Sequence, residues 1–208
     1  IGGGGSYTRN QNLTYAQVSG DWTAGGIARW QPNDSLQITP FWSYAKHYEH
    51  GGAPVVSVSD VSYPIYRVLK LYNQPWVDWA TISDNLGATA KWKVNDDWSV
   101  NAGGFRSRTY YPPNDEIYVL NTDATGAGDL SATRSAPRGI DSVSGEIRAS
   151  RRFDTEETRN NIHFSLRGRN RNVQSGGLDR IEFGPTNLYA LPHLPEPNYS
   201  TGQVSASH

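Results

Sequence analysis

Residues 85–111, NLGATAKWKVNDDWSVNAGGFRSRTYY, decide the fold of this chain because they read as a strand, a tight turn and a second strand. Small and apolar residues alternate with polar residues on both sides of the turn, and this period of two places the two sets on opposite faces of a β-strand. Asn95, Asp96 and Asp97 predict the turn, because Asn and Asp bond their own backbone and tolerate left-handed conformations. One face is therefore apolar, with a Trp beside the turn on each strand, and the other is polar and charged.

Composition limits the classes of protein to which the chain can belong. The 208 residues have a net charge of −1, which gives no general attraction to nucleic acid. Cys is absent, so disulfides and thiolate metal sites are excluded. Met is absent even at position 1, so we expect a segment of a longer polypeptide. Only 36% of the residues are apolar and the mean hydropathy is −0.64, which is typical of strands with one apolar face. The Gly-rich residues 1–6 are interpreted as a flexible linker or a native loop.

The pattern of strand, short turn and strand recurs along the chain. Asp34, Asp96 and Asp154 each mark a turn and are about 60 residues apart, which indicates an architectural repeat. Long segments rich in Gly, Pro and aromatic residues separate the hairpins. The predicted strands are 12–30, 36–48, 85–93, 98–110, 142–153 and 160–174, and the predicted long loops are 49–83, 111–141 and 175–200.

Short turns that alternate with long loops are typical of an outer-membrane β-barrel. A compact soluble domain rarely contains several structureless loops of about 30 residues. We therefore predict an all-β fold, an antiparallel transmembrane β-barrel segment with its apolar face toward lipid and its polar face toward the lumen. The alternatives are a soluble β-sandwich that serves as a binding or surface module, and a passive porin. No catalytic motif is present, so we expect no enzymatic activity.

Several stretches resemble the barrel of TonB-dependent outer-membrane receptors of the siderophore-receptor type. They are GGIARWQPND at 25–34, LQITPFWS at 36–43, WSVNAGGFRS at 98–107 and FSLRGR at 164–169. The resemblance implies a plugged barrel of about 22 strands and about 650 residues, of which this chain would supply about three hairpins. The plug domain is expected to lie outside this chain.

The resemblance also implies a function in the Gram-negative outer membrane. Such a receptor binds a scarce solute, here most simply a ferric siderophore, and imports it with energy that the TonB complex transmits through the N-terminal plug. The implied partners are the TonB complex, outer-membrane lipid, a small-molecule metal chelate and the remainder of the barrel, with no nucleic acid. No cofactor is implied, because iron would enter only as part of the transported chelate.

The first group of candidate ligand-binding residues consists of arginines at alternate positions: Arg167, Arg169 and Arg171, joined by Arg106 and Arg108. Residues spaced by two project from one side of a strand, so we predict a cationic wall that attracts an anionic ferric chelate. The alternative is ordinary ion pairing with carboxylates such as Glu146. Gly103 and Gly104 leave open a β-bulge, which would change the direction of the two arginines that follow.

The second group is aromatic and belongs to the long loop of residues 49–83: Tyr63, Tyr66, Trp76 and Trp79. One interpretation is a surface that grips the ligand at the mouth of the barrel. The other is that the loop packs on itself or lies near lipid headgroups, where Trp and Tyr concentrate. His47, Glu49 and His50 lie close together at a strand end, but they lack the spacing of a known metal site, so we expect no bound metal.

Overall fold

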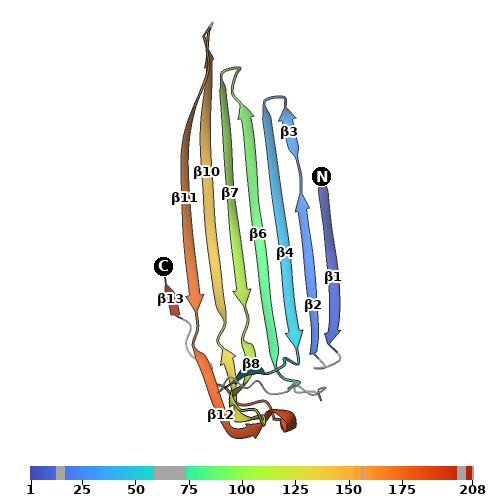
Figure 1. Ribbon diagram of the computed structural model, residues 1–208. Coiled ribbons are helices and arrows are strands. Elements are labelled where there is room, and N and C mark those ends of the chain that lie inside the picture. Colours follow the sequence, from blue (N-terminus) through green and yellow to red (C-terminus); the bar gives the residue numbers. More distant parts are fainter. Residues whose placement is uncertain (13–16, 59–73, 156, 201–204, 208) are drawn as a thin grey trace.

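The computed structural model describes residues 1–12, 17–58, 74–155, 157–200 and 205–207 (Figure 1). Its main element is a nine-stranded sheet, here called the large sheet, in which neighbouring strands are antiparallel. The strands follow chain order: β1 (Gly2–Asn12), β2 (Gln17–Ile27), β4 (Leu36–His50), β6 (Asp78–Lys93), β7 (Trp98–Tyr111), β10 (Arg138–Asp154), β11 (Arg159–Ser175) and β13 (Ser205–Ser207), with β3 (Trp30–Asn33) paired to β4. The all-β prediction is confirmed. No helix in the described ranges is long and apolar enough to cross a membrane.

Three short turns lie at one end of the large sheet, and the long connections lie at the other end (Figure 1). Asn33 accepts hydrogen bonds from the backbone N–H groups two and three residues later, at 3.0 and 2.9 Å. Asn95 does the same at 3.0 and 2.8 Å. In the third turn the backbone N–H of Thr158 donates to Oγ1 of Thr155 at 3.0 Å. The predicted turns are therefore present, but Asn and Thr side chains bond the backbone there.

Several strands differ from the predicted ranges. Residues 12–30, expected as one strand, contain the end of β1, all of β2 and the start of β3. Of residues 1–6, interpreted as a linker or loop, residues 2–6 pair with β2 in a register that runs unbroken from Gly2 opposite Ile27. Glycines carry no side chains whose alternation could reveal a strand. Here β1 is defined by its backbone hydrogen bonds to β2. Likewise β6 begins at Asp78 and β10 at Arg138, inside the predicted loops.

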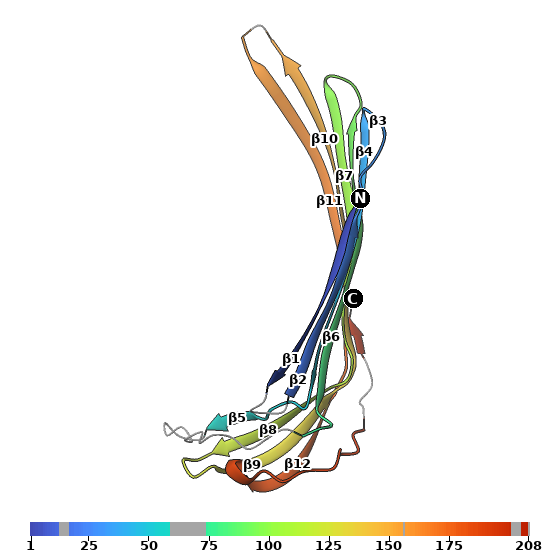
Figure 2. The ribbon, with the colours of Figure 1, turned by 90° about the vertical axis from the view of Figure 1, so that its right-hand side faces the viewer.

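The long connections form a second sheet, here called the loop sheet. Its strands are β12 (Leu178–Asn187), β9 (Ala127–Ser135), β8 (Asn114–Thr122) and β5 (Val55–Val58), in that spatial order, and the 3-10 turn η1 (Leu188–Ala190) follows β12. The loop sheet projects toward the concave side of the large sheet (Figure 2). The prediction that residues 49–83, 111–141 and 175–200 are loops was therefore incomplete, because these short strands have no clear period of two.

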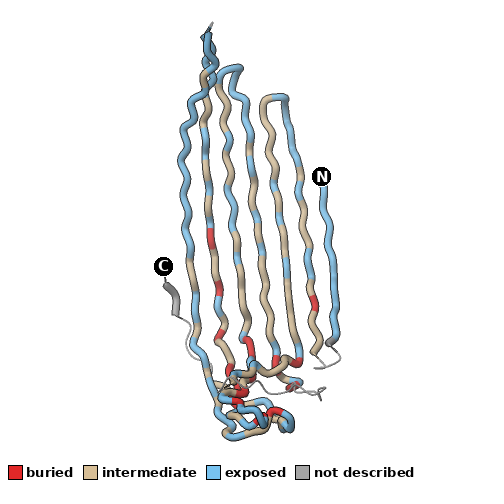
Figure 3. Tube along the Cα trace, viewed as in Figure 1, coloured by how far each residue is buried: buried red, intermediate tan, exposed pale blue. Residues whose placement is uncertain are grey.

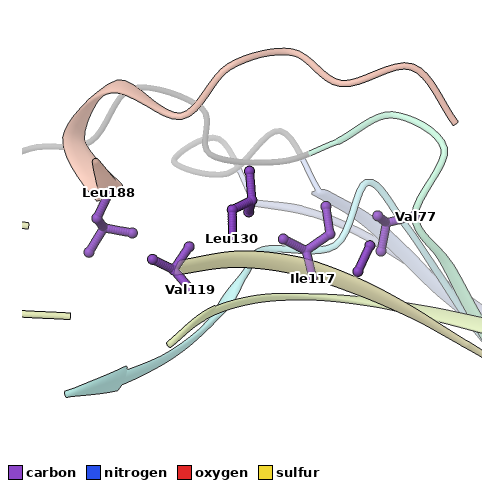
Figure 4. Packing of buried hydrophobic residues seen from close by; sticks show 6 residues of the cluster. Val77, Ile117, Val119, Leu130 and Leu188 are labelled. Atoms are coloured by element: carbon purple, nitrogen blue, oxygen red, sulfur yellow. The ribbon is translucent and has the colours of Figure 1, made fainter. Parts of the chain in front are cut away.

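Buried residues are concentrated in and around the loop sheet, and only a few lie along the strands of the large sheet (Figure 3). Among the described residues, the buried apolar side chains belong to the loop sheet and the segments beside it: Val77, Ile117, Val119, Leu130, Ala132, Ala136 and Leu188 (Figure 4). The large sheet leaves its own apolar side chains exposed, for example Leu86 at 57%, Phe164 at 63% and Leu166 at 75%. Large exposed apolar patches of this kind mark surfaces that contact protein, membrane or ligand.

The register assigns each side chain of the large sheet to one of two faces. One row across β4, β6, β7, β10 and β11 is apolar: Ile38, Ala90, Ala102, Ile147 and Leu166. The adjacent row is polar: Gln37, Lys91, Asn101, Arg148 and Ser165. Directly paired residues share a face and successive residues alternate. We name these the apolar face and the polar face.

Aromatic side chains border the apolar face at both ends of an aliphatic zone. Trp92 and Trp98 lie near the turns, while Trp22 and Trp42 lie toward the loop sheet. On β6, Trp92 is separated from Leu86 by six residues, which corresponds to about 20 Å at about 3.4 Å per residue.

Side chains of neighbouring strands fill the space above Gly87 on the polar face, so a substitution there measures how closely the large sheet is packed. A Cβ there would stand 2.6 Å from Phe41 Cζ and from Phe105 Cβ, whereas a Cβ at Gly168 would meet nothing within 4 Å. We expect Gly87→Ala to lower the free energy of unfolding of the intact protein by about 1–3 kcal/mol in urea titrations. The control Gly168→Ala should change it by less than about 0.5 kcal/mol. Equal changes would contradict the packing of the two rings over Gly87.

Candidate functional site

An arginine ladder, formed by Arg167, Arg169 and Arg171, runs along the polar face of β11. These residues lie opposite Glu146, Ser144 and Ser142 of β10. The Nε of Arg169 donates to the hydroxyl of Ser142 at 3.0 Å. Arg148 Nη2 pairs with Glu146 at 2.7 Å, so this carboxylate is bonded to a cation of its own strand.

Two adjoining clefts of about 420 and 440 Å³ lie beside the arginine ladder. Phe105, Ser144 and Arg169 line both clefts. With Arg148 included, four guanidinium groups share this surface with the single carboxylate of Glu146. The local excess of positive charge can attract an anionic ligand or an acidic protein segment.

Arg106 and Arg108 do not join the ladder. The register runs without a shift through residues 103–104, so the bulge considered from the sequence is absent. Arg106 lies opposite Leu86, and Arg108 lies opposite Asp141, which places both arginines on the apolar face. The prediction of one wall of five arginines was therefore wrong. A spacing of two relates residues within one strand, but it does not relate β7 to β11.

A second pocket, the mouth pocket, lies where the polar face meets the loop sheet. It has a volume of about 280 Å³ and is lined by Glu49 and Trp79 of the large sheet and by Val55 and Glu116 of the loop sheet. Gln17 donates to Glu49 at 2.7 Å, which holds this carboxylate at the wall. The pocket therefore presents carboxylates and an indole ring, in contrast to the cationic ladder.

His47 and His50 lie on opposite faces of β4 and share no site. His47 Nδ1 is 2.7 Å from a carboxylate oxygen of Asp21, and its Nε2 is 3.2 Å from one of Glu49. His50 is 2.5 Å from Asp78 on the apolar face. No group of three His or carboxylate side chains within the described ranges could hold a metal ion.

The predicted aromatic residues have different surroundings. Trp79 lines the mouth pocket, and its ring centroid is 5.5 Å from that of His47. Trp76 bonds to a different segment of the chain, because its indole N–H donates to the carbonyl of Leu194 at 3.0 Å. Tyr63 and Tyr66 lie outside the described residues.

Gln74 ties the loop before β6 to the segment after η1. Its side-chain NH₂ donates to the carbonyl of Pro192, and its oxygen accepts from the backbone N–H of Leu194, both at 2.8 Å. We call this contact the strap. Together with the Trp76 bond to the same segment, it closes the chain over the core of the loop sheet.

A buried ion pair supports the wall of the mouth pocket. Arg134 donates to the two carboxylate oxygens of Asp115, at 2.6 Å from Nε and 2.8 Å from Nη2, and its Nη2 also donates to Glu196 at 2.8 Å. The guanidinium lies 4.5 Å from the ring centroid of Tyr199. The bond to Asp115 raises the pKa of Arg134 above its usual range, and burial raises the pKa of Tyr199 to about 12. The arginine is therefore charged and the phenol neutral at physiological pH.

Sequence reasoning missed this ion pair. Asp115 and Arg134 fall in the range that was predicted as a loop, and Glu196 is 62 residues from Arg134 along the chain. No local spacing links these three residues. Only the pairing of β8 with β9, which sets Asp115 opposite Arg134, brings the first two together.

Comparison with known proteins finds solved structures of the same fold. No family model matches the chain, and no curated protein matches it. A chain of the FpvAI–pyocin S2 complex aligns with a TM-score of 0.75 and 12% identity, over 98% of this chain and 29% of its own length. The ferripyoverdine receptor of the outer membrane of Pseudomonas aeruginosa, bound to ferripyoverdine, aligns with a TM-score of 0.72 and 12% identity, over 96% and 28%.

A third similar structure is BauA, the ferric preacinetobactin receptor from Acinetobacter baumannii, with a TM-score of 0.69 and 15% identity, over 94% of this chain and 30% of that one. At these identities the likeness establishes the fold alone. The chain has the antiparallel β-structure of the barrel portion of outer-membrane receptors, and it spans about three tenths of the length of the receptors it matches.

The buried ion pair gives a test of the loop sheet. We expect Arg134→Ala to destabilise the loop sheet by about 3–5 kcal/mol, because it leaves the buried carboxylate of Asp115 without a counter-charge. Hydrogen exchange of the β8 and β9 amides measures this loss. The control Arg180→Ala, which removes an exposed pair with Glu182, should cost less than about 1 kcal/mol. Similar exchange rates in the two variants would show that the Asp115 pair does not hold the sheet.

Proposed function

We propose that this chain is part of a TonB-dependent outer-membrane receptor that binds a ferric siderophore and imports it. The observation that supports this most is the exposed apolar face of the large sheet, in a fold shared with ferric siderophore receptors. In a soluble β-sandwich a second sheet would pack about 10 Å from such a face. The described residues place no layer there, which favours lipid over the sandwich alternative.

The membrane placement follows from the two borders of the apolar face. An outer-membrane barrel carries an apolar band about 25 Å tall between aromatic girdles. The aliphatic zone of about 20 Å between Trp92 and Trp42 is close to this height. The polar face then lines the lumen, the short turns face the periplasm and the loop sheet faces the exterior.

A barrel in lipid has no free strand edges, so the proposal requires further strands beside β1 and β11. The chain spans about three tenths of the length of the matched receptors. We assign the other strands, and the plug through which the TonB complex would act, to the rest of the same polypeptide.

The arginine ladder and the mouth pocket are the proposed contacts for the ligand. The ladder would attract an anionic ferric chelate to the lumen wall, and Trp79 would contact it at the mouth. Iron would be present only within the transported chelate, so the receptor itself needs no cofactor.

Uptake of radioactive iron as a ferric siderophore tests the proposed function in cells that produce the intact protein. We expect saturable uptake that is lost when TonB is deleted or when a protonophore collapses the inner-membrane gradient. Uptake that is independent of TonB would indicate a passive porin. Recovery of the protein without detergent would end the membrane proposal.

A pair of neighbouring substitutions tests the assignment of the faces. Leu166 lies near the middle of the aliphatic zone and Ser165 lies on the polar face. In lipid vesicles, Leu166→Arg should destabilise the barrel by about 2–4 kcal/mol and Ser165→Arg by much less, because only the first places a charge in hydrocarbon. Denaturant titration of the folded barrel measures both, and equal losses would contradict the assignment.

The arginine ladder gives a test of ligand binding. A charge-assisted hydrogen bond contributes about 1.5–3 kcal/mol, so we expect Arg169→Gln with Arg171→Gln to weaken binding of the transported ferric siderophore by roughly tenfold or more. The control Arg159→Gln removes an exposed arginine beside a turn. Calorimetric titration should show unchanged affinity in the control. Unchanged affinity in the double variant would remove the ladder from the ligand site.

A further inference from the structure

We propose that His47 is a proton-dependent clamp on the mouth pocket, so that the pocket binds an anionic metal chelate more tightly when this histidine is protonated. The inference deepens the proposed function and rests on it, because the mouth pocket is the proposed contact for the transported chelate. His47 acts through Glu49, a residue of the pocket wall, and is therefore a positioning residue.

The ring of His47 joins two neighbouring strands through their carboxylates. Asp21 of β2 lies directly opposite His47 of β4, and its carboxylate oxygen is 2.7 Å from Nδ1. Glu49, two residues further along β4, places an oxygen 3.2 Å from Nε2. A neutral imidazole has one N–H and can donate to only one of these carboxylates, whereas an imidazolium donates to both. The arrangement therefore fits the protonated ring, whose charge both carboxylates stabilise.

Glu49 is held at each of its carboxylate oxygens by a different side chain. His47 contacts Oε1, and Gln17 donates to Oε2 at 2.7 Å. When His47 loses a proton, the remaining N–H stays with the closer carboxylate of Asp21, and a lone pair of Nε2 then faces Glu49. Because two acceptors repel each other, Glu49 loses this contact. Its carboxylate is then free to turn toward the pocket that it lines.

The charged groups around His47 on the polar face and across the pocket are carboxylates. Asp21 comes from β2, Glu49 from β4 itself and Glu116 from β8 across the mouth pocket. Asp115 of β8 also lines the pocket, but the buried ion pair described above compensates its charge. The neighbouring polar-face side chains of β1, β2 and β6 are uncharged: Thr8, Asn10, Ser19, Thr23, Trp79 and Thr81. The proton of His47 therefore sets the net charge of this region.

This proton affects an anionic chelate in two ways. The carboxylates of Asp21, Glu49 and Glu116 repel an anion, and the imidazolium offsets one of their three charges. The imidazolium also holds Glu49 at the wall, which leaves the pocket open. Histidine ordinarily changes its charge between about pH 5 and pH 8, and both effects favour the anion on the acid side. Binding of an anionic chelate should therefore weaken as the pH rises through this range.

Paramagnetic relaxation measures the charge of the mouth without the transported ligand. The intact receptor in uncharged detergent is labelled with 5-fluorotryptophan. The reporter is Trp79, whose ring centroid is 5.5 Å from that of His47, and its signal is assigned with Trp79→Phe. The probes are an anionic gadolinium chelate and a neutral one of the same size. We expect the ratio of anionic to neutral relaxation enhancement at Trp79 to fall about twofold or more from about pH 5 to about pH 8.

Substitutions of His47 separate its charge from its packing. His47→Lys keeps a cation throughout this pH range and should hold the ratio near the wild-type acid level, whereas His47→Gln should hold it near the alkaline level. Asp21→Asn removes a carboxylate that stabilises the imidazolium, so the midpoint should move to lower pH, and it tests the clamp if a His47 variant folds poorly. The matched control His50→Gln alters a histidine that is bonded to Asp78 on the apolar face, and it should retain the wild-type profile.

Three outcomes would overturn the inference. A wild-type ratio that does not change with pH would show that no proton controls the charge of the mouth. A ratio that still falls in both His47 variants would assign the proton to another group, and a constant ratio in His50→Gln would assign it to that histidine. Each of these results leaves TonB-dependent uptake intact. Failure of the proposed function is seen instead in the uptake and fractionation measurements, while the pH profile at Trp79 remains.

Discussion

The register between neighbouring strands is the constraint on which the rest of the structure depends. The pairing of β10 with β7 and with β11 continues for more than a dozen residues on each side without a shift. A slip of one residue would move Ile147 to the polar side and Glu146 to the apolar side, and it would do the same to every other residue of the strand. Two different environments, one on each face, therefore stabilise a single register.

The two sheets differ in whether they bury their apolar side chains. The loop sheet has its own apolar core, capped by the segment after η1, and its buried carboxylate of Asp115 has a bidentate partner in Arg134. In the large sheet, hydrogen bonds between neighbouring strands satisfy the backbone N–H and C=O groups, but the apolar side chains remain exposed. One chain thus contains a part suited to water and a part suited to an apolar phase, and the junction between them forms the mouth pocket.

Periodicity predicted the hairpins well because their side chains alternate clearly, as in residues 85–111. It failed for β1, where successive glycines leave no pattern to read, and for the short strands of the loop sheet. It gave the direction of Arg167, Arg169 and Arg171 relative to one another, since they share a strand. It could not relate them to Arg106, because the relative facing of two strands depends on every residue between them. The pair of Asp115 and Arg134 exists only through tertiary pairing, so no local signal could have revealed it.

The strap has a consequence for the order in which the protein folds. Gln74 bonds to residues 118 and 120 positions later, whereas the hairpins join residues that are close in sequence. Contacts of such long range close large loops and form after local ones. β6, β7, β10 and β11 all lie between the two ends of the strap, so their hairpins can assemble before it closes. The segment after η1, which the strap holds over the loop sheet, is therefore expected to be among the last parts to become ordered, and to open first when the chain unfolds.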